Sequence, residues 1–373
     1  MGKSHDRVLH IVYAMNTGGV ESWLMSIYRQ LDRRKIQFDF LVNTTEKAFF
    51  DDEIKELGGN IYFAGALNSP VQIYKTAREL IGKNSYSAVH CHNVENATPV
   101  LKAAFDCKVP NRIYHSHNDL NTKLVHLSLA KKIYLQISRE LALKYANKFL
   151  AVSKSAGESL FKEKPYEKLS LGIEIERFDP SNNAILKREE FGLKKEHFVV
   201  GHVGRFDTQK NHTFLVQIAK ELIAINSNTR VLLIGKGTLE EEIKDKIAKE
   251  NLEDFFIFTG LRGDVPDIMK NIMDAFLFPS LSEGLGLVLV EAQAAGLPVV
   301  CSDVIPDEAI VNSELVKKVS LTQSVKEWAE ILKEQYNRNK KYDKNKAYEK
   351  VNDSPFNLNN TIKILEAIWQ EKK

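Results

Sequence analysis

The sequence has few cysteines and no long apolar run, and these absences exclude several classes of protein. Its 373 residues include three cysteines, Cys91, Cys107 and Cys301, which are scattered and form no Cys-x-x-Cys pair. We therefore expect reduced thiols, as in a cytoplasmic protein, and no disulfide framework. No run of about 18 apolar residues predicts a membrane-spanning helix. The first residues also lack the apolar core of a secretory signal.

Charge of one sign is lacking as well. The net charge is +3, from 52 Lys and Arg against 49 Asp and Glu, so we expect no nucleic-acid partner. The basic residues are uneven, however. The segment 121–150 carries six Lys and Arg against one acid, Glu140. The plainer interpretation of this segment is a core helix with a solvated basic face. The alternative is a surface that contacts an anionic membrane or a lipid-linked acceptor.

Short β-branched and aromatic runs alternate with helical periodicity along the chain. The predicted strands cover 8–14, 38–42, 60–64, 87–91, 111–115 and 148–152, and then 198–203, 230–235, 255–259, 275–278 and 298–301. The helices predicted between and after them include 20–31, 71–82, 95–105, 123–146, 211–226, 286–295 and 324–338. Continuous apolar strands separated by helices indicate parallel sheets covered on both faces. The sequence therefore predicts an α/β protein with doubly wound sheets.

The alternation restarts after residue 195, and the length also favours two domains, since single cores stop growing near ~250–300 residues. We expect a first domain over 1–180 and a second over 181–355. A last helix within 356–373 is expected to pack back on the first domain. In such sheets, ligands bind outside the carboxyl ends of the strands, so the loops there are the places to search for chemistry.

The loop after the first strand contains Gly18 and Gly19. Paired glycines let a backbone approach a ligand, and the helix that follows offers N–H groups to an anion. The loop does not match the Gly-x-Gly-x-x-Gly fingerprint, so dinucleotide binding is weakly supported. A simple tight turn explains the glycines equally well.

Two cations, Arg205 and Lys210, follow the first strand of the second half. Two positioned cations can hold a diphosphate without a metal, Arg through a planar fork and Lys as a point charge. By spacing alone, a solvated loop with incidental charges remains the plainer interpretation.

Two acids, Glu283 and Glu291, flank a segment made only of glycine and apolar residues. Their separation is close to two helical turns, so both can face the same way. A carboxylate on a buried helix needs a hydrogen-bonding partner, and sugar hydroxyls would serve. The alternative is a helix cap at Glu283 and a buried ion pair at Glu291.

Two histidine pairs end neighbouring strands: His90 with His92, and His115 with His117. Four imidazoles could bind a metal, but only if the two pairs converge. We expect no metal here and interpret one histidine of each pair as structural. His117 is nearest its strand end and is the candidate for a hydrogen bond to a sugar.

These motifs occur in an order that resembles glycosyltransferase family 4, a retaining family of GT-B fold. The resemblance rests on Gly18-Gly19, His115-Ser-His117, Gly204-Arg205 with Lys210, Gly235 with Gly237, and Phe278-Pro-Ser through Glu291, and it covers nearly the whole chain. It implies two Rossmann-like domains facing across a cleft, with the acceptor on the first and the donor on the second. The first half is similar to members that build bacterial capsule or exopolysaccharide.

The resemblance also implies roles for matching residues. Arg205 and Lys210 would bind the donor diphosphate, Gly18 and Gly19 would close over it, and His117 would contact the sugar near the reaction centre. The remaining donor-binding positions are Leu261 and Arg262 at the base, Glu283, Gly284, Leu285 and Gly286 at the sugar, and Glu291 at the ribose. His117, Arg205, Lys210 and Glu283 are the expected catalytic set.

The implied reaction moves a sugar from a UDP- or GDP-linked donor to a glycan or lipid-linked acceptor, with no cofactor and no metal. The absence of an Asp-x-Asp pair at a strand end agrees with that expectation. The alternatives are a nucleotide-sugar epimerase of the same fold and a non-catalytic partner subunit of a transferase. We expect a cytoplasmic protein that works at the inner face of the membrane. The choice of substrate is expected to depend on the loops 44–50, 65–70 and 116–126.

One position departs from the family pattern. The family often has Asn-Gly-Ile or Asn-Gly-Val at the end of the first domain, whereas this chain has Leu171-Gly172-Ile173. The departure bears on the acceptor side more than on the donor side.

Overall fold

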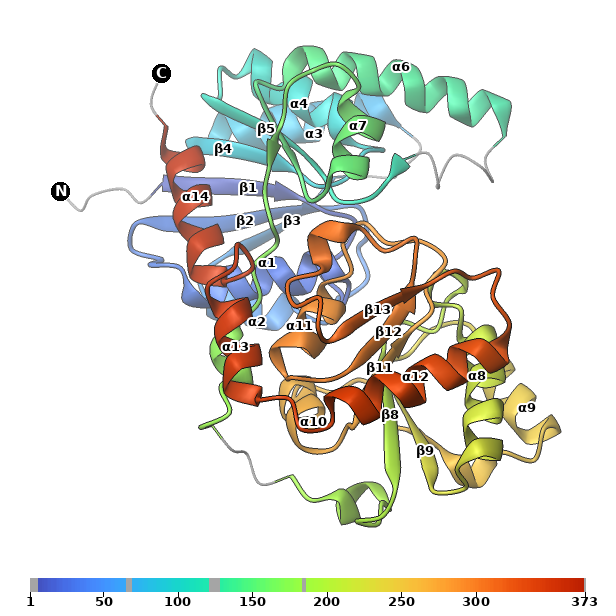
Figure 1. The fold of residues 1–373 in the computed structure, drawn as a ribbon. Coiled ribbons are helices and arrows are strands. Elements are labelled where there is room, and N and C mark those ends of the chain that lie inside the picture. Colours follow the sequence, from blue (N-terminus) through green and yellow to red (C-terminus); the bar gives the residue numbers. More distant parts are fainter. Residues whose placement is uncertain (1–5, 65–68, 121–127, 183–185, 372–373) are drawn as a thin grey trace. The chain divides into compact units, whose positions relative to one another are not determined.

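The computed structural model describes residues 6–64, 69–120, 128–182 and 186–371. The chain forms two compact units, shown in Figure 1. Unit 1 comprises Met1–Ile173 together with Leu358–Lys373, and unit 2 comprises Glu174–Asn357. The chain therefore leaves unit 1 after Ile173 and returns to it at Leu358, whereas the sequence suggested 181 as the start of the second domain.

Unit 1 contains a parallel sheet of seven strands in the order β3-β2-β1-β4-β5-β6-β7. The strands are β1 (Asp6–Ile11), β2 (Ile36–Val42), β3 (Asn60–Phe63), β4 (Tyr86–Cys91), β5 (Asn111–Ser116), β6 (Lys148–Ala151) and β7 (Glu167–Lys168). The order reverses direction beside β1, which neighbours both β2 and β4. The loops after β1 and β4 therefore flank the switch point where doubly wound sheets bind ligands.

The helices of unit 1 cover both faces of this sheet. They are α1 (Gly19–Gln30), α2 (Asp51–Glu56), α3 (Pro70–Lys83), α4 (Ala97–Asp106), α6 (Leu129–Tyr145), α7 (Lys154–Phe161) and α14 (Leu358–Gln370). Leu9 and Ile11 of β1 join a core with α3, α4, α6 and α7. His10, between them in the chain, points to the opposite face, because side chains alternate along a strand, and it contacts Trp369 of α14 there.

The last helix, α14, is an integral part of unit 1. Asn111 Nδ2 donates to the backbone oxygen of Trp369 at 3.1 Å, and Leu358 N donates to Ile173 O at 3.1 Å. Leu171, where the family often has Asn, is buried at this junction. An added Cβ at Gly172 would collide with the backbone of Leu358. A buried apolar side chain at 171 therefore suits the packing of α14 on this segment.

Unit 2 contains a parallel sheet of six strands in the order β10-β9-β8-β11-β12-β13. The strands are β8 (Phe198–Val203), β9 (Thr229–Ile234), β10 (Phe256–Phe258), β11 (Ala275–Phe278), β12 (Val299–Ser302) and β13 (Val316–Val319). The helices are α8 (His212–Ile225), α9 (Glu240–Lys249), α10 (Val265–Asn271), α11 (Leu287–Ala294), α12 (Val325–Asn339) and α13 (Lys344–Asn352). The switch point lies at β8, between β9 and β11.

The two parallel sheets predicted from the sequence are confirmed, and the longer strands lie within two or three residues of the expected bounds. The short edge strands β7 and β13 and the helices α7 and α13 were missed, because brief or polar elements give little periodicity. Of the helix predicted over 123–146, residues 123–127 lie outside the described part of the chain, and α6 begins at Leu129. Among the described residues, no helix combines the length and apolar character needed to cross a bilayer.

Candidate functional site

The loop after β8 is shaped by its own aspartate. Arg205 Nε donates to Asp207 Oδ2 at 2.8 Å, and Asp207 Oδ1 accepts from the backbone N–H of Lys210 at 3.2 Å. The side chain of Arg205 is 69% exposed, so its guanidinium lies at the surface of unit 2. Phe206, next to it, is buried in the core and anchors the loop. The loop thus presents one cation to solvent and turns the other inward.

Lys210 meets Glu283 in this unit. Lys210 Nζ lies 2.5 Å from Glu283 Oε1, and the two side chains are only 17% and 8% exposed. The same ammonium lies 4.9 Å from the centre of the Phe278 ring. A cation between a carboxylate and an aromatic face is held by both. The cationic and acidic segments that the sequence singled out therefore come together.

Backbone and amide hydrogen bonds fix these two segments to each other. Leu281 N donates to Gln209 O at 2.8 Å, and Gln209 Nε2 donates to Ser282 O at 2.7 Å. Asn211 Nδ2 donates to Pro279 O at 3.1 Å. Because the loops are joined on both sides of Lys210, the charged pair is positioned before any ligand arrives.

Two glycines allow the loop after β9 to lie against the loop after β8. Gly235 has φ +140°, a conformation that side chains disfavour. An added Cβ at Gly237 would lie 2.6 Å from the backbone nitrogen of Phe206. Phe206 N instead donates to Lys236 O at 3.1 Å. Both glycines are required by close approach rather than by a free turn.

Helix α11 carries Glu291 and begins after Gly286, which has φ +84°. Glu283 lies before this cap, outside the helix. Glu291 has no hydrogen-bond or ion-pair partner in the described part of the chain. Burial raises the pKa of Glu291 from 4.5 to about 7. Smaller effects come from Arg177, which lowers this pKa, and from Glu174, which raises it. A partly buried carboxyl group without a partner is unusual and is available to a ligand.

Leu261 and Arg262 follow β10, beside the glycine loop. Leu261 is exposed, while Arg262 forms a two-point ion pair with Asp264, with N···O distances of 2.8 and 2.6 Å. This pairing raises the pKa of Arg262. Gly260 O accepts from Gly235 N at 2.9 Å and joins the two loops. The position predicted for a base is thus adjacent to the loop after β9, although the side chain of Arg262 is already paired with Asp264.

In unit 1, Gly18 caps α1 and Gly19 begins it. A Cβ at Gly18 would meet the carboxylate of Glu21, whereas one at Gly19 would meet nothing within 4 Å. The backbone at Gly19 is therefore open to a ligand, but space alone does not require glycine there.

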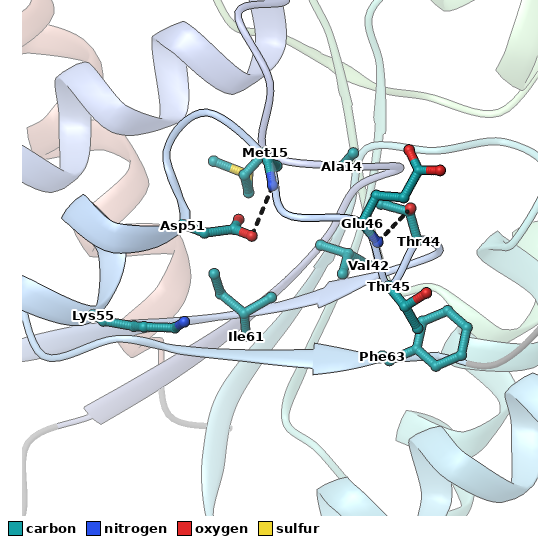
Figure 2. A pocket seen from close by; sticks show the side chains of 11 residues that line it. Ala14, Met15, Val42, Thr44, Thr45, Glu46, Asp51, Lys55, Ile61 and Phe63 are labelled. Carbon is teal, nitrogen blue, oxygen red and sulfur yellow. Dashed lines mark hydrogen bonds between the residues drawn. The ribbon is translucent and has the colours of Figure 1, made fainter.

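A hollow of about 280 Å³ opens at the carboxyl ends of β1, β2 and β3 in unit 1. Figure 2 shows Glu46 and Lys55 at opposite sides of it, with Phe63 at its edge. Neither Glu46 nor Lys55 has a side-chain partner within the residues described. Its other lining residues are Ala14, Met15, Val42, Thr44, Thr45, Ala48, Asp51 and Ile61. A mixed lining of hydroxyls, carboxylates and apolar groups suits a sugar ring.

The two histidine pairs converge. Any joint role depended on this convergence, which the sequence alone could not show. His92 bonds at both ring nitrogens: its Nε2 lies 3.1 Å from His10 Nδ1, and its Nδ1 lies 2.8 Å from His117 Nε2. We call His10, His92 and His117 the first imidazole line. His117 is buried, so it is not an open surface group.

A second imidazole line consists of His90 and His115, and its protons can be placed. Trp369 Nε1 donates to His90 Nδ1 at 3.3 Å. An indole N–H can only donate, so neutral His90 carries its proton on Nε2 and donates it to His115 Nδ1 at 3.2 Å. Neutral His115 must then carry its proton on Nε2.

The two lines stack on each other in an apolar setting. The ring centres of His90 and His92 lie 4.1 Å apart, and those of His115 and His117 lie 4.0 Å apart. Burial lowers the pKa of His10 to about 3 and the pKa of His90, His92 and His115 well below 6.5. These four imidazoles are therefore neutral at pH 7.

Sequence reasoning missed His10, Trp23 and Trp369 as members of this cluster. Trp23 of α1 faces the rings of His92, His115 and His117 edge-on. The register of β1 with β4 places His10 opposite His90, so matching strand positions could have revealed His10. Trp369 is 279 residues from His90, and no local pattern predicts that pairing.

Comparisons with known proteins place this geometry in a family. The description "Glycosyltransferase Family 4" matches residues 17–176, and "Glycosyl transferases group 1" matches residues 184–350. The two matched segments follow one another along most of the chain.

Similar sequences carry consistent names. A glycosyltransferase of Bacillus subtilis, EpsF, is 34% identical over 341 residues, which cover 89% of this chain and 88% of that protein. A capsular polysaccharide biosynthesis glycosyltransferase of Staphylococcus aureus, CapH, is 26% identical and covers 98% of this chain and 99% of that one. A UDP-Gal:alpha-D-GlcNAc-diphosphoundecaprenol alpha-1,3-galactosyltransferase of Escherichia coli is 29% identical over 72% of this chain and 69% of its own length.

Solved structures share the fold at low identity. Anabaena HepE in complex with UDP-glucose superposes with a TM-score of 0.78 at 18% identity, over 97% of this chain and 98% of that one. WaaG, a glycosyltransferase involved in lipopolysaccharide biosynthesis, superposes with a TM-score of 0.74 at 16% identity, over 98% of this chain and all of the other. With its two parallel sheets of GT-B type and its match to EpsF, the chain belongs to the family 4 glycosyltransferases and is a transferase of sugars.

Proposed function

We propose that the protein is a retaining transferase that moves a sugar from a UDP-linked donor to a glycan or lipid-linked acceptor in bacterial cell-surface polysaccharide synthesis. The observation that carries the proposal is the Lys210–Glu283 pair, buried between two joined loops at the switch point of unit 2. Relatives named for capsule synthesis and for a UDP-galactose donor support the pathway and the nucleotide. Transferase names among the relatives do not favour an epimerase or a non-catalytic partner.

In this proposal, Lys210 and Arg205 bind the diphosphate of the donor. Arg205 would leave Asp207 and turn its exposed guanidinium to the phosphates, and Gly18 and Gly19 would also bind them. Lys210 would exchange part of its contact with Glu283 for a phosphate oxygen. Glu283 and the N–H groups of Gly284, Leu285 and Gly286 would then hold the donor sugar.

The rest of the donor would extend along unit 2. The carboxyl group of Glu291, which has no partner among the described residues, would accept hydrogen bonds from the ribose. Leu261 would pack against the base with Arg262 beside it. His117 would contact the sugar near the anomeric carbon. The proposed domain roles are acceptor binding by unit 1 and donor binding by unit 2.

The chemistry is cleavage of the bond between the anomeric carbon and the diphosphate oxygen. Negative charge develops on the leaving phosphate, and Lys210 and Arg205 stabilise it where it forms. The acceptor hydroxyl attacks from the face that the phosphate leaves, forms the new glycosidic bond and gives its proton to that phosphate. Configuration at the anomeric carbon is then retained without a protein nucleophile, and neither a metal nor a cofactor takes part.

The acceptor would use the hollow of unit 1. Its carboxylates, Glu46 and Asp51, outnumber its one ammonium, Lys55, so it suits an uncharged sugar ring better than a phosphate. The loop 44–50 is joined to the loop after β1, since Phe50 N donates to Met15 O at 2.9 Å. Of the other two loops expected to set the choice of substrate, 65–70 and 116–126, residues 65–68 and 121–126 lie outside the described residues.

Helix α6 supports contact with a membrane. Its large apolar side chains Leu129, Ile133, Tyr134, Ile137 and Leu141 are exposed, Leu129 by 74%. Lys131, Lys132 and Lys144 lie on the same helix. An apolar stripe with flanking lysines is typical of helices that lie in an anionic lipid surface. We propose that the protein works at the cytoplasmic face of the membrane through α6, with the lipid-linked acceptor in the bilayer.

Two experiments test these proposals. A panel of nucleotide diphosphate sugars, assayed by thermal shift and then by product analysis, should identify a UDP-sugar and a product with retained configuration. A changed sugar released without acceptor would instead identify an epimerase. Co-sedimentation with anionic vesicles at low salt, lost in Ile133→Glu and at high salt, tests α6. Binding to neutral vesicles alone, or to none, contradicts the membrane role.

A further inference from the structure

We propose that His92, supported by His10, is a positioning residue that sets the orientation and proton placement of His117 through the first imidazole line. The inference rests on the proposed contact between His117 and the donor sugar. Nothing in the family motifs points to His10 or His92. The bond of His10 to His92, and of His92 to His117, is visible only once the strands are assembled.

The argument begins with the bonding capacity of His92. A neutral imidazole has one donor and one acceptor nitrogen. His92 uses both nitrogens, at 3.1 Å to His10 and at 2.8 Å to His117. If it donates to one neighbour, it must accept from the other. The line therefore has two proton arrangements, and in each of them His10 and His92 together decide whether His117 Nε2 donates or accepts.

Two ring contacts and one hydrogen bond restrict the orientation of the His117 imidazole. Its ring lies against that of His115, with centres 4.0 Å apart, and Trp23 meets it edge-on at 6.0 Å. These packing contacts restrict tilting but do not distinguish the two flipped forms of an imidazole. The 2.8 Å bond from His92 makes that distinction, because a flip would remove Nε2 from His92 Nδ1.

His10 and His92 remain uncharged, so this counting of their donor and acceptor nitrogens holds at neutral pH. Burial lowers the pKa of His10 to about 3 and that of His92 well below 6.5, with the neighbouring imidazoles adding to the effect on His92. Neutral His10 and His92 therefore hold His117 by hydrogen bonding rather than by charge. The charge of the leaving group is then met by Lys210 and Arg205 in the proposed reaction.

A metal ion is the competing explanation for such a cluster. His92, His115 and His117 each offer a ring nitrogen within 4.8 Å of the others. However, the bond from Trp369 through His90 occupies the lone pair of His115 Nδ1 and leaves a proton on Nε2. His115 then has no lone pair for a metal. The direction of the hydrogen bonds in the second imidazole line therefore favours a hydrogen-bonded histidine cluster over a metal site.

The test compares two ring-preserving substitutions on the same strand region. His92→Phe removes both bonds to the first line, whereas His90→Phe is the matched control, since His90 does not bond to His117. We expect His92→Phe to lower kcat about tenfold or more, as misplacement of a reacting group does, with little change in KM for the donor. His90→Phe should lower the melting temperature but leave kcat near wild type. Equal kcat values for the two variants would overturn the inference.

Rescue and coupling separate positioning from a general structural effect. His92→Gln can still donate and accept, so it should recover most of the lost kcat. In a His117→Ala background, His92→Phe should cause little further loss, because His92 acts through His117. A full additional loss would overturn the inference. If His117→Ala is itself fully active, the proposed role of His117 fails; if it is inactive while His92→Phe is fully active, only the present inference fails.

Two spectroscopic and analytical measurements complete the test. The ¹⁵N shifts of the His117 ring should show one neutral tautomer in the wild type and a mixture in His92→Phe, and a mixture in both would contradict the proposal. Elemental analysis and titration with Zn²⁺ should show no stoichiometric binding. One bound zinc, lost in His92→Phe and needed for turnover, would replace the hydrogen-bonded line by a metal site.

Discussion

The candidate site of unit 2 is built around an ion pair, whereas that of unit 1 is built around hydrogen-bonded imidazole rings. In unit 2, Lys210 and Glu283 pair between loops that follow β8 and β11, two adjacent strands. In unit 1, five imidazoles from three strands bond to one another and to Trp369 of the last helix. In the proposed reaction, these are two ways to prepare a site: a fixed charge where charge develops, and fixed ring positions where it does not.

Among the substitutions that test this comparison, removal of the Lys210 ammonium should change turnover most. We expect Lys210→Ala to lower kcat by about 10²–10³-fold, the size of loss seen when a charge-stabilising group is removed from a reaction centre. Lys220→Ala is the control, because Lys220 also pairs with an acid, Glu250, but on the exposed surface of α8. Steady-state kinetics and melting curves of both variants give the answer. Unchanged turnover in Lys210→Ala would contradict the assigned role.

Mild acid should weaken unit 1 through its imidazoles. Unfolded histidines bind protons near pH 6.5, while His10 in the fold does so only near pH 3, and the pKa of His90 and His115 is also lowered. The contribution of these neutral imidazoles to the free energy of unfolding is complete above pH 6.5. It is lost as the pH falls toward their pKa in the folded protein. Each imidazole changes the unfolding free energy by up to about 1.4 kcal/mol per pH unit.

Calorimetry between pH 7 and 5 should therefore show a falling melting temperature, with amide exchange increasing first in unit 1. The replacement His10→Phe should flatten this dependence, since it removes one of the groups that titrate on unfolding. Unit 2 carries its own buried pair, His202 and His212, but the raised pKa of Glu291 acts in the opposite direction there. If amide exchange increased earlier in unit 2 than in unit 1 as the pH fell, the comparison would be reversed.

The close approach of the loops in unit 2 can be tested by adding one methyl group. In Gly237→Ala, the new Cβ would lie 2.6 Å from the backbone nitrogen of Phe206, which cannot yield easily. We expect a loss of about 1–3 kcal/mol in stability and weaker nucleotide binding. Gly82→Ala in α3 is the control, because nothing lies within 4 Å of its added Cβ. A wild-type melting curve for Gly237→Ala would show that the loops do not need this glycine.

The smallest expected effect concerns the ribose. If hydroxyls of the ribose donate to Glu291, they bind the ionised carboxylate, whose pKa is about 7 in the free protein. Affinity for UDP should then rise from pH 6 to pH 8 by roughly tenfold, as the ionised fraction does. Glu291→Gln should bind more weakly and without this pH dependence. Calorimetric titration of both proteins decides the matter, and a flat profile in the wild type would remove Glu291 from the ribose site.

The contrast between the units also explains what the sequence could predict. Lys210 and Glu283 lie next to a strand end and a helix start that periodicity locates, so their meeting in one unit was foreseeable. The exposure of Arg205 and its pairing with Asp207 were not, because side-chain direction in a loop depends on local hydrogen bonds.

In unit 1, the histidine pairs were visible but their partners were not. Strand order decides that β1 lies beside β4, and only this places His10 against His92. The pairing of Trp369 with His90 depends on the return of the chain after residue 357. Contacts of this kind are set by topology, which local patterns do not encode.

The return of α14 to unit 1 has a consequence for how the protein is made. The ribosome delivers most of unit 1 first, then all of unit 2, and only afterwards the helix that supplies Trp369 and covers His10. A nascent chain therefore carries an unfinished first unit, with a buried face still open to solvent, throughout synthesis of the second. Removal of α14 should therefore harm unit 1, although the rest of that unit is encoded at the opposite end of this sequence.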